Sequence, residues 1–220
     1  MKEANRTLSD MDALILVGGQ GTRIRHLLPK GVPKCMADVG GILFLDILIR
    51  HLRSFSFKKL ILASGYGYHA LDNHLTEKYG RDGGDLLLYR EHESRGTAGA
   101  VEYVKGNLGD PFWIFNGDTY CDVNCKEMLA RHEATKSTIT VACDEEFGHV
   151  GTFVASKRFV DLIPKVDGKV DMAEIFTLLG QRHEPVGWFL TDAPFYDIGD
   201  ETGLSKFRIL MLQHGTLNVQ

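Results

Sequence analysis

The stretch Gly18-Gly19-Gln20-Gly21-Thr22-Arg23 decides the fold, because it directly follows the apolar run Ala13-Leu14-Ile15-Leu16-Val17. A buried strand that ends in a glycine-rich turn leaves backbone N–H groups free to face an anion. Glycine allows positive φ and close approach of a ligand. Arg23 adds a planar guanidinium suited to phosphate oxygens. A tight turn with no ligand is the simpler alternative, so the rest of the chain must decide between the two interpretations.

Two common nucleotide motifs do not fit this loop. The dinucleotide-binding fingerprint requires a third glycine where Ile24 stands, and the P-loop requires a Gly-Lys-Ser/Thr ending that is absent. The loop therefore belongs to neither class.

Apolar β-type runs alternate with amphipathic helical patterns along the chain. The predicted strands are 13–17, 59–64, 86–89, 112–115, 138–142, 151–155 and 188–190. The predicted helices are 43–54, 70–79, 98–104, 125–135, 172–179 and 202–213. Repeated strand–helix units predict an α/β fold with a doubly wound, mostly parallel sheet and helices on both faces. In such sheets the ligand crevice lies at the carboxyl ends of the strands, where the glycine loop sits.

The composition is that of a globular enzyme. The chain has 220 residues, 44% hydrophobic and 25% charged, with a net charge of −4. No basic run predicts nucleic-acid binding, and no apolar stretch approaches the ~20 residues of a membrane helix. We expect no signal peptide before the first strand. We expect residues 1–10 to form a polar, mobile extension and residues 11–220 a single domain.

The four cysteines are Cys35, Cys121, Cys125 and Cys143, and they lack the paired spacing of zinc sites. Reduced thiols in a cytoplasmic protein are the simplest account of them.

Acidic residues follow two of the apolar runs. Asn116-Gly117-Asp118 comes after the predicted strand 112–115, and Asp197 follows a short apolar run. Two carboxylates from separate strands can hold Mg²⁺ and leave positions open for water and phosphate. Each aspartate alone has a turn or cap role as its alternative. Pro33-Lys34 closes the loop after Arg23, where a lysine could reach a phosphate.

In this order, these motifs resemble those of the sugar-1-phosphate nucleotidylyltransferases. The resemblance runs from about Met11 to Gly203 and is strongest to the short bacterial heptose-1-phosphate and mannose-1-phosphate guanylyltransferases. It includes Glu93-Ser94-Arg95-Gly96-Thr97-Ala98-Gly99 and Asp197-Ile198-Gly199. The family implies a Rossmann-like, GT-A-like fold and a role in nucleotide-sugar biosynthesis for lipopolysaccharide or capsule.

The resemblance also implies a reaction and a set of site residues. The phosphate of a sugar 1-phosphate attacks the α-phosphorus of a nucleoside triphosphate, and pyrophosphate leaves. The implied catalytic residues are Arg23, Lys34 and Asp118, with Mg²⁺ held by Asp118 and Asp197. The implied nucleotide-binding residues are Gly18, Gly19, Gly21, Thr22, Gly96 and Thr97. Gly151 and Asp197 are implied on the sugar-phosphate side.

Glu91 and Glu93 precede Gly96 in the loop that approaches the base in this family. An ionised carboxylate accepts two hydrogen bonds and donates none, which suits the N1–H and N2 amino donors of guanine. Uracil and thymine present carbonyls that would repel it. GTP is therefore the expected nucleotide and Glu91 the expected base contact, with solvated loop acids as the alternative.

The chain departs from the family in two places. Cys35 stands where a second proline is usual, which softens the loop. The segment around 148–152 is shorter than in the family and lacks its Glu-Lys pair. Either the sugar side of the site is rebuilt, or the sequence omits a mobile loop there.

Two other functions stay open. One is a catalytically weak regulatory homologue that binds nucleotides or sugar nucleotides. The intact Arg23, Lys34, Asp118 and Asp197 argue against a pure binder. The other is a nucleotide-sugar-dependent glycosyltransferase, although Gly117-Asp118-Thr119-Tyr120 supplies no Asp-x-Asp motif.

The remaining residues have structural interpretations. His26, His69, His74 and His92 are expected at the surface or in loops, and Trp113 and Trp188 in the core. The apolar residues of 209–212 could serve a homodimer interface, but the sequence does not decide the oligomeric state.

Overall fold

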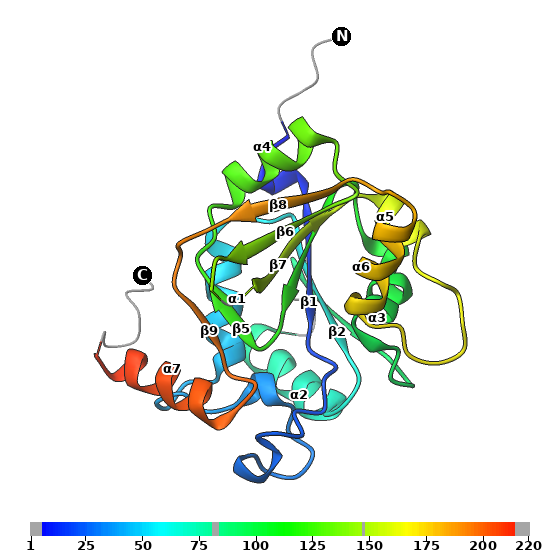
Figure 1. Ribbon diagram of the computed structural model, residues 1–220. Helices are drawn as coiled ribbons and strands as arrows, with labels where there is room; N and C mark the ends of the chain where they lie inside the picture. Colours follow the sequence, from blue (N-terminus) through cyan, green and yellow to red (C-terminus); the bar gives the residue numbers. More distant parts are fainter. Residues whose placement is uncertain (1–5, 81–83, 147, 214–220) are drawn as a thin grey trace.

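The computed structural model describes residues 6–80, 84–146 and 148–213, and its centre is a seven-stranded sheet in the order β3-β2-β1-β4-β7-β6-β8 (Figure 1). β1 pairs in parallel with β2 and β4, and β2 pairs in parallel with β3. β7 runs antiparallel between β4 and β6, and β8 returns parallel to β6. The predicted mostly parallel sheet is therefore confirmed.

The bounds of the predicted elements lie close to their predicted ranges, whereas α5 and the 3₁₀ turns were not predicted. The strands of the main sheet are β1 (Asp12–Leu16), β2 (Lys59–Ser64), β3 (Leu86–Arg90), β4 (Phe112–Asn116), β6 (Ile139–Asp144), β7 (Gly148–Ala155) and β8 (Val186–Leu190). The α-helices are α1 (Phe44–Ser54), α2 (Tyr68–Tyr79), α3 (Gly96–Val104), α4 (Cys125–Thr135), α5 (Lys157–Asp161), α6 (Met172–Gln181) and α7 (Glu201–Gln213). Short 3₁₀ turns are η1 (Leu8–Asp10), η2 (Arg25–Leu27), η3 (Lys34–Met36) and η4 (Lys105–Asn107).

The sheet is buried on both faces because apolar side chains project from its strands toward both faces. In β1, Ala13 and Ile15 pack into one core cluster, whereas Leu14 points to the other side and packs into a second cluster. The first cluster contains side chains from α1, α2, α4 and α7. The second contains side chains from α3, α5 and α6. Figure 1 shows these two groups of helices on opposite faces of the sheet, as predicted. None of the helices in the described ranges has the length and apolar character needed to cross a membrane.

The strand order reverses between β1 and β4, and this is the point that positions the site. The chain passes from β1 to β2 and β3, then crosses back through α3 to β4 on the other side of β1. Loops that leave the carboxyl ends of β1 and β4 therefore diverge, which opens a crevice between them. The glycine loop and Asn116-Gly117-Asp118 are the segments that follow these two strands.

A short antiparallel ribbon extends this end of the molecule. β5 (Thr119–Cys121) pairs with β9 (Phe195–Asp197), with Thr119 opposite Asp197. The sequence did not predict either strand, because three residues are too few to show a periodicity. The ribbon joins the C-terminal part of the chain to the end of β4.

Three local predictions were wrong. Trp188 is 57% exposed, because it lies on the edge strand β8 and points away from the helix that packs there, whereas Trp113 is fully buried as predicted. Leu8 is buried in the first core cluster, so η1 is packed rather than a mobile extension, and residues 1–5 lie outside the described residues. His74 is not a simple surface residue, because it bonds to the buried Asp46.

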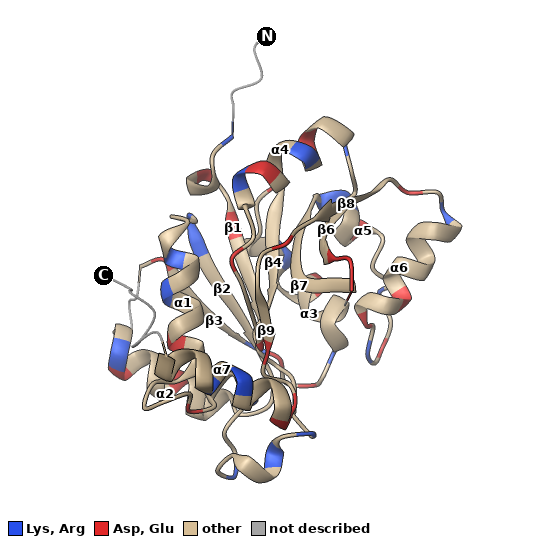
Figure 2. Ribbon diagram, turned by 60° about the vertical axis from the view of Figure 1, so that its left-hand side comes forward, with Lys and Arg blue, Asp and Glu red and all other residues tan. Residues whose placement is uncertain are grey.

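Asp46 links helices α1 and α2. Its carboxylate oxygens lie 2.9 Å from His74 Nε2, 2.7 Å from Lys78 Nζ and 2.9 Å from Tyr79 OH. Burial alone would raise the pKa of Asp46, but the hydrogen bonds from Lys78, His74 and Tyr79 outweigh it and lower the pKa. The remaining charged residues lie mostly on helices and loops, with both signs interspersed (Figure 2).

Candidate active site

At the start of the glycine loop, the backbone at the end of β1 lies close to the ends of β2 and β4. A Cβ at Gly18 would lie 3.1 Å from Gly65 N, so the loop passes close to the end of β2. A Cβ at Gly117 would lie 2.6 Å from Leu16 O, so the end of β4 passes equally close to β1. The approach at Gly117 requires glycine and the one at Gly18 is tight, and together they set the ends of the strands side by side.

Lys34 lies across this loop. Gly21 has φ +59°, and a Cβ there would lie 2.8 Å from the Cβ of Lys34. The ammonium group of Lys34 donates to Asp118 Oδ2, and the two side chains are 22% and 13% exposed. The structure thus brings together three predicted site elements: the loop after β1, the Pro33-Lys34 turn and the end of β4.

Asp197 and Arg23 meet at the same place, next to Gly199. A Cβ at Gly199 would lie 2.8 Å from both Arg23 Nη2 and Asp197 Oδ1, and 3.5 Å from Asp118 Oδ2. The β5–β9 ribbon causes this convergence, and the Ile198 N–H donates to Asp118 O at 2.9 Å. Arg23 is 65% exposed and lies 3.7 Å from Asp200 Oδ2.

Asp197 lies near another carboxylate and near two cationic side chains. Asp197 keeps an exposed surface, yet partial desolvation raises the pKa of its carboxyl, and the nearby Asp118 adds to the shift. Lys34 and Arg23 oppose this effect. Two carboxylates that repel each other are stabilised by a shared cation.

This donor set fits Mg²⁺ better than zinc. Within the described ranges no group of three or more His, Cys, Asp or Glu side chains could hold a metal ion. Mg²⁺ is commonly held by one or two carboxylates together with substrate phosphates, and it keeps waters in its other positions. Asp118 and Asp197 supply that number of carboxylates. Cys35, next to Lys34, is no candidate nucleophile, because burial raises the pKa of its thiol to about 12.

A cavity of about 410 Å³ extends from the glycine loop to the start of α3. Its volume falls in the range of small-molecule sites. It is lined by residues that the sequence predicted for the nucleotide, namely Gly18, Gly19, Thr22, Glu91, Gly96 and Thr97, and by Lys34 and Asp118, which the sequence predicted as catalytic. The structure therefore brings these residues to one cavity. Gly21 and Arg23 do not line it: Gly21 lies next to Lys34, and Arg23 lies next to Gly199 and Asp200.

Glu91 lies at the end of the cavity near α3 and is 7% exposed. Its Oε1 atom is buried and has no hydrogen-bond partner among the described residues. Burial raises the pKa of this carboxyl, and the backbone N–H and the charge of Arg95 oppose the shift. A buried acceptor without a partner is costly, and a ligand donor would satisfy it.

Sequence reasoning missed part of the wall of this cavity. Lys169 and Asp171 line it, although they lie more than fifty residues after Asp118 in the chain. Asp171 Oδ1 accepts the N–H of Thr97 at 3.0 Å and also caps α6 in a capping box with Glu174. The Asp-x-x-Glu spacing marks the start of a helix, but nothing in it marks a contact with Thr97.

Gly151 does not line the cavity and supports it from behind. It has φ +71°, and a Cβ there would lie 2.9 Å from Asn116 Nδ2 and 3.1 Å from Thr119 Oγ1. Where the sequence is short, β6 and β7 pair as far as Asp144 opposite Gly148. The pairing of β6 with β7 therefore extends past the end of β4, where Phe115 pairs with Thr152.

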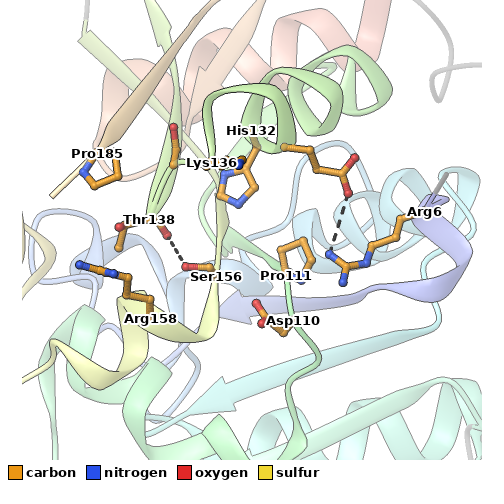
Figure 3. A pocket seen from close by; sticks show the side chains of 11 residues that line it. Arg6, Asp110, Pro111, His132, Lys136, Thr138, Ser156, Arg158 and Pro185 are labelled. Carbon is orange, nitrogen blue, oxygen red and sulfur yellow. Dashed lines mark hydrogen bonds and ion pairs between the residues drawn. The ribbon is translucent and has the colours of Figure 1, made fainter. Parts of the chain in front are cut away.

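A second cavity of about 690 Å³ lies elsewhere and is lined by none of the predicted site residues. Figure 3 shows His132, Ser156, Asp110 and Arg158 around it. Burial lowers the pKa of His132 to about 4, and its Nδ1 lies 2.9 Å from Thr140 Oγ1. Arg158 donates two hydrogen bonds to Glu184, from Nε to Oε2 at 2.7 Å and from Nη2 to Oε1 at 2.8 Å. The four side chains named here all have protein partners, most of them outside the cavity lining, so the cavity has the character of a structural groove.

Comparison with known proteins identifies the family. The profile of the nucleotidyl transferase family matches residues 12–148, more than half of the chain, and the chain belongs to that family. The predicted membership in a family of nucleotidyltransferase enzymes is therefore confirmed.

Two curated relatives and one solved structure agree with this assignment. The chain is 28% identical over 162 residues to the D-glycero-alpha-D-manno-heptose 1-phosphate guanylyltransferase of Campylobacter jejuni, covering 73% of this chain and 69% of the relative. It is 34% identical over 149 residues to the mannose-1-phosphate guanylyltransferase catalytic subunit beta of Xenopus tropicalis, covering 66% of this chain and 41% of the relative. The crystal structure of HddC from Yersinia pseudotuberculosis superposes with a TM-score of 0.76 at 24% identity, over 91% of this chain and 99% of that one. This last likeness shows the fold alone.

Proposed function

We propose that this protein transfers a nucleoside monophosphate from a nucleoside triphosphate, GTP, to a sugar 1-phosphate of the heptose or mannose type. An oxygen of the sugar phosphate forms a bond to the α-phosphorus, the bond from that phosphorus to the β-phosphate oxygen breaks, and pyrophosphate leaves with the electron pair. The products are a nucleoside diphosphate sugar and pyrophosphate. The observation that carries this proposal is the meeting of Lys34, Asp118 and Asp197 beside a glycine-lined cavity.

The chain's own residues act by positioning and by charge, which is what phosphoryl transfer requires. Backbone N–H groups of the glycine loop face the nucleotide phosphates. The ammonium group of Lys34 sits at the carboxylate of Asp118 and can exchange that contact for an oxygen of the transferred phosphoryl group. Arg23, exposed beside Asp197, meets the charge that builds on pyrophosphate.

Mg²⁺ is the proposed cofactor, with Asp118 and Asp197 as its protein ligands. When bound, it supplies neutralisation of charge on the reacting phosphoryl oxygens. The pKa of Asp197 is raised partly by Asp118, so a shared divalent cation would remove a repulsion that is present without it.

The test of the function is pyrophosphate release with Mg²⁺ from a panel of nucleoside triphosphates and sugar 1-phosphates. We expect release with GTP and either mannose 1-phosphate or a heptose 1-phosphate. Tight nucleotide binding without pyrophosphate release from any pair would instead indicate a regulatory homologue. Transfer from a nucleotide sugar to an acceptor would indicate a glycosyltransferase.

We further propose that Glu91 selects guanine. Its buried Oε1 has no hydrogen-bond partner in the described part of the chain, and the N1–H and N2 amino groups of guanine can supply donors. Only the ionised carboxylate accepts both hydrogen bonds. Because the pKa of Glu91 is raised, the affinity for GTP should be full above that pKa and fall as the pH decreases through it.

Competition binding of GTP, ATP, CTP, UTP and dTTP tests this specificity. We expect wild type to prefer GTP, and Glu91→Gln to reduce that preference about tenfold or more, as expected for the loss of a charge-assisted pair. Glu93→Gln is the matched control, because Glu93 does not line the cavity. A preference for a pyrimidine nucleotide, or a GTP preference that Glu91→Gln leaves intact, would exclude this role.

Two further proposals concern the setting of the enzyme. We propose that it acts in the cytoplasm, in nucleotide-sugar biosynthesis for lipopolysaccharide or capsule. All four cysteines are free, as in proteins of a reducing compartment. We also propose a homodimer that uses the apolar side of α7, where Ile209 and Leu212 are 54% and 76% exposed. Sedimentation equilibrium of wild type and of Leu212→Glu would test the dimer.

A further inference from the structure

Lys169 is a second lysine of the active-site cavity, alongside Lys34. It lies between α5 and α6 and lines the cavity together with Gly19, Asn116 and Asp118. Both Lys169 and Lys165, which lies on the same segment, are exposed, but Lys165 lines a different cavity.

The backbone next to Lys169 is fixed against α3. Val170 is 4% exposed and packs in the second core cluster. Its N–H donates to Arg95 O at 2.8 Å, and its carbonyl accepts the N–H groups of Ala98 at 2.9 Å and Gly99 at 3.0 Å. Because the next residue is held by three backbone hydrogen bonds, the Cα of Lys169 has a defined place at the cavity.

The residue on the other side of Val170 strengthens this attachment. Asp171 accepts the Thr97 N–H, and the N–H of Met172 donates to Thr97 Oγ1 at 2.9 Å. Gly96 lies so close that a Cβ there would be 2.5 Å from Val170 O. The segment 169–172 is therefore docked onto the start of α3, which forms one end of the cavity.

The other charged side chains that line the cavity have partners of their own or lie apart from Lys169. The acidic side chains are Glu91, Asp118 and Asp171, and the cationic ones are Lys34 and Lys169. Lys34 is bonded to Asp118, and Asp171 is engaged by Thr97 and by the cap of α6. Within the described part of the chain, Lys169 takes part in no hydrogen bond or ion pair through its side chain. An unpaired cation at a cavity that receives phosphates is suited to hold one of them.

We propose that Lys169 binds the phosphate of the sugar 1-phosphate and so determines the affinity for the second substrate. This inference rests on the function proposed above, in which two phosphate-bearing substrates occupy one cavity. The nucleotide phosphates are assigned to the loop after β1 with Lys34 and Arg23, and the base is assigned to Glu91. Lys169 comes from a separate segment of the chain and supplies the remaining positive charge.

The test separates the two substrates kinetically. In Lys169→Met we expect the KM for the sugar 1-phosphate to rise about tenfold or more. The KM for GTP and the kcat at saturation should stay within about twofold of wild type. The reason is that the lost contact holds the sugar phosphate equally well in the ground state and in the transition state. Lys169→Arg should restore most of the affinity for the sugar 1-phosphate, and Lys165→Met, on the same segment, should behave as wild type.

A binding measurement gives a readout that does not depend on turnover. Titration calorimetry with mannose 1-phosphate, and with GTP in parallel, should show the loss only for the sugar phosphate in Lys169→Met. If Lys169→Met leaves the sugar-phosphate KM and affinity unchanged while wild type turns over, this inference is overturned and the proposed function stands. Equal loss of GTP affinity would also overturn it and assign Lys169 to the nucleotide. A wild-type protein that neither binds nor converts any sugar 1-phosphate would overturn both.

Discussion

A single methyl group added at Gly96 should damage the site. Its φ is +75°, and a Cβ would lie 2.5 Å from Val170 O and 2.8 Å from Asp171 Oδ1. The left-handed conformation alone costs a non-glycine residue about 1–2 kcal/mol. Val170 O cannot retreat without weakening the hydrogen bonds from Ala98 and Gly99, which contribute about 1 kcal/mol each. We therefore expect Gly96→Ala to lower the free energy of unfolding by about 3–4 kcal/mol.

Urea unfolding with wild type and Gly96→Ala measures this loss, and nucleotide titration should show weaker binding in the same variant. Gly180→Ala is the matched control, because Gly180 lies within α6 and a Cβ there would contact nothing within 4 Å. Alanine in a helix interior is favoured over glycine by about 1 kcal/mol or less, so the control should be as stable as wild type or more so. A Gly96→Ala protein within about 0.5 kcal/mol of wild type, with normal nucleotide affinity, would refute the reasoning.

The other predictions concern charge. Asp118→Asn and Asp197→Asn should each lower kcat about 100-fold or more without unfolding the protein. Asp200→Asn, the control, should leave kcat unchanged. Near-normal pyrophosphate release by Asp118→Asn or Asp197→Asn at saturating Mg²⁺ would reject the metal assignment. Lys34→Met should lower kcat more than it weakens GTP binding, and a variant that binds poorly but turns over normally at saturation would contradict this. Because the pKa of Asp46 is lowered in the fold, its stabilising contribution is present at neutral pH and lost as the pH falls below about 4. Asp46→Asn should therefore reduce the stability at pH 7 more than at pH 3, and an equal loss at both pH values would count against the ionised link.

Much of the fold follows from local patterns in the sequence. The strands that end at the glycine loop and at Asn116-Gly117-Asp118 are long apolar runs, and their place in the sheet follows from the alternation with helices. Trp188 shows the limit of this reasoning. An apolar edge strand such as β8 has the same composition as a central strand, and only the neighbours decide which face is covered.

The candidate site was predictable where its residues belong to short motifs. Lys34 follows Pro33, Asp118 follows Gly117, and Asp197 lies two residues before Gly199. The crevice rule for α/β sheets brings such motifs together. Lys169 was not predictable in this way. Its place depends on hydrogen bonds between residue 170 and the start of α3, which are separated by some seventy residues and carry no local signature.

Glycines determine the arrangement of the site as much as the functional side chains do. Gly117 lets β4 approach β1, Gly21 lets the loop approach Lys34, and Gly199 leaves room for Arg23 and Asp197 near Asp118. In each case a Cβ would come within 2.8 Å of the group that it would displace. A substitution at one of these glycines changes the distance between functional groups, whereas a substitution at Lys34 changes only the chemistry at a preserved position. Variants of the two kinds should therefore differ in stability even where they lose the same activity.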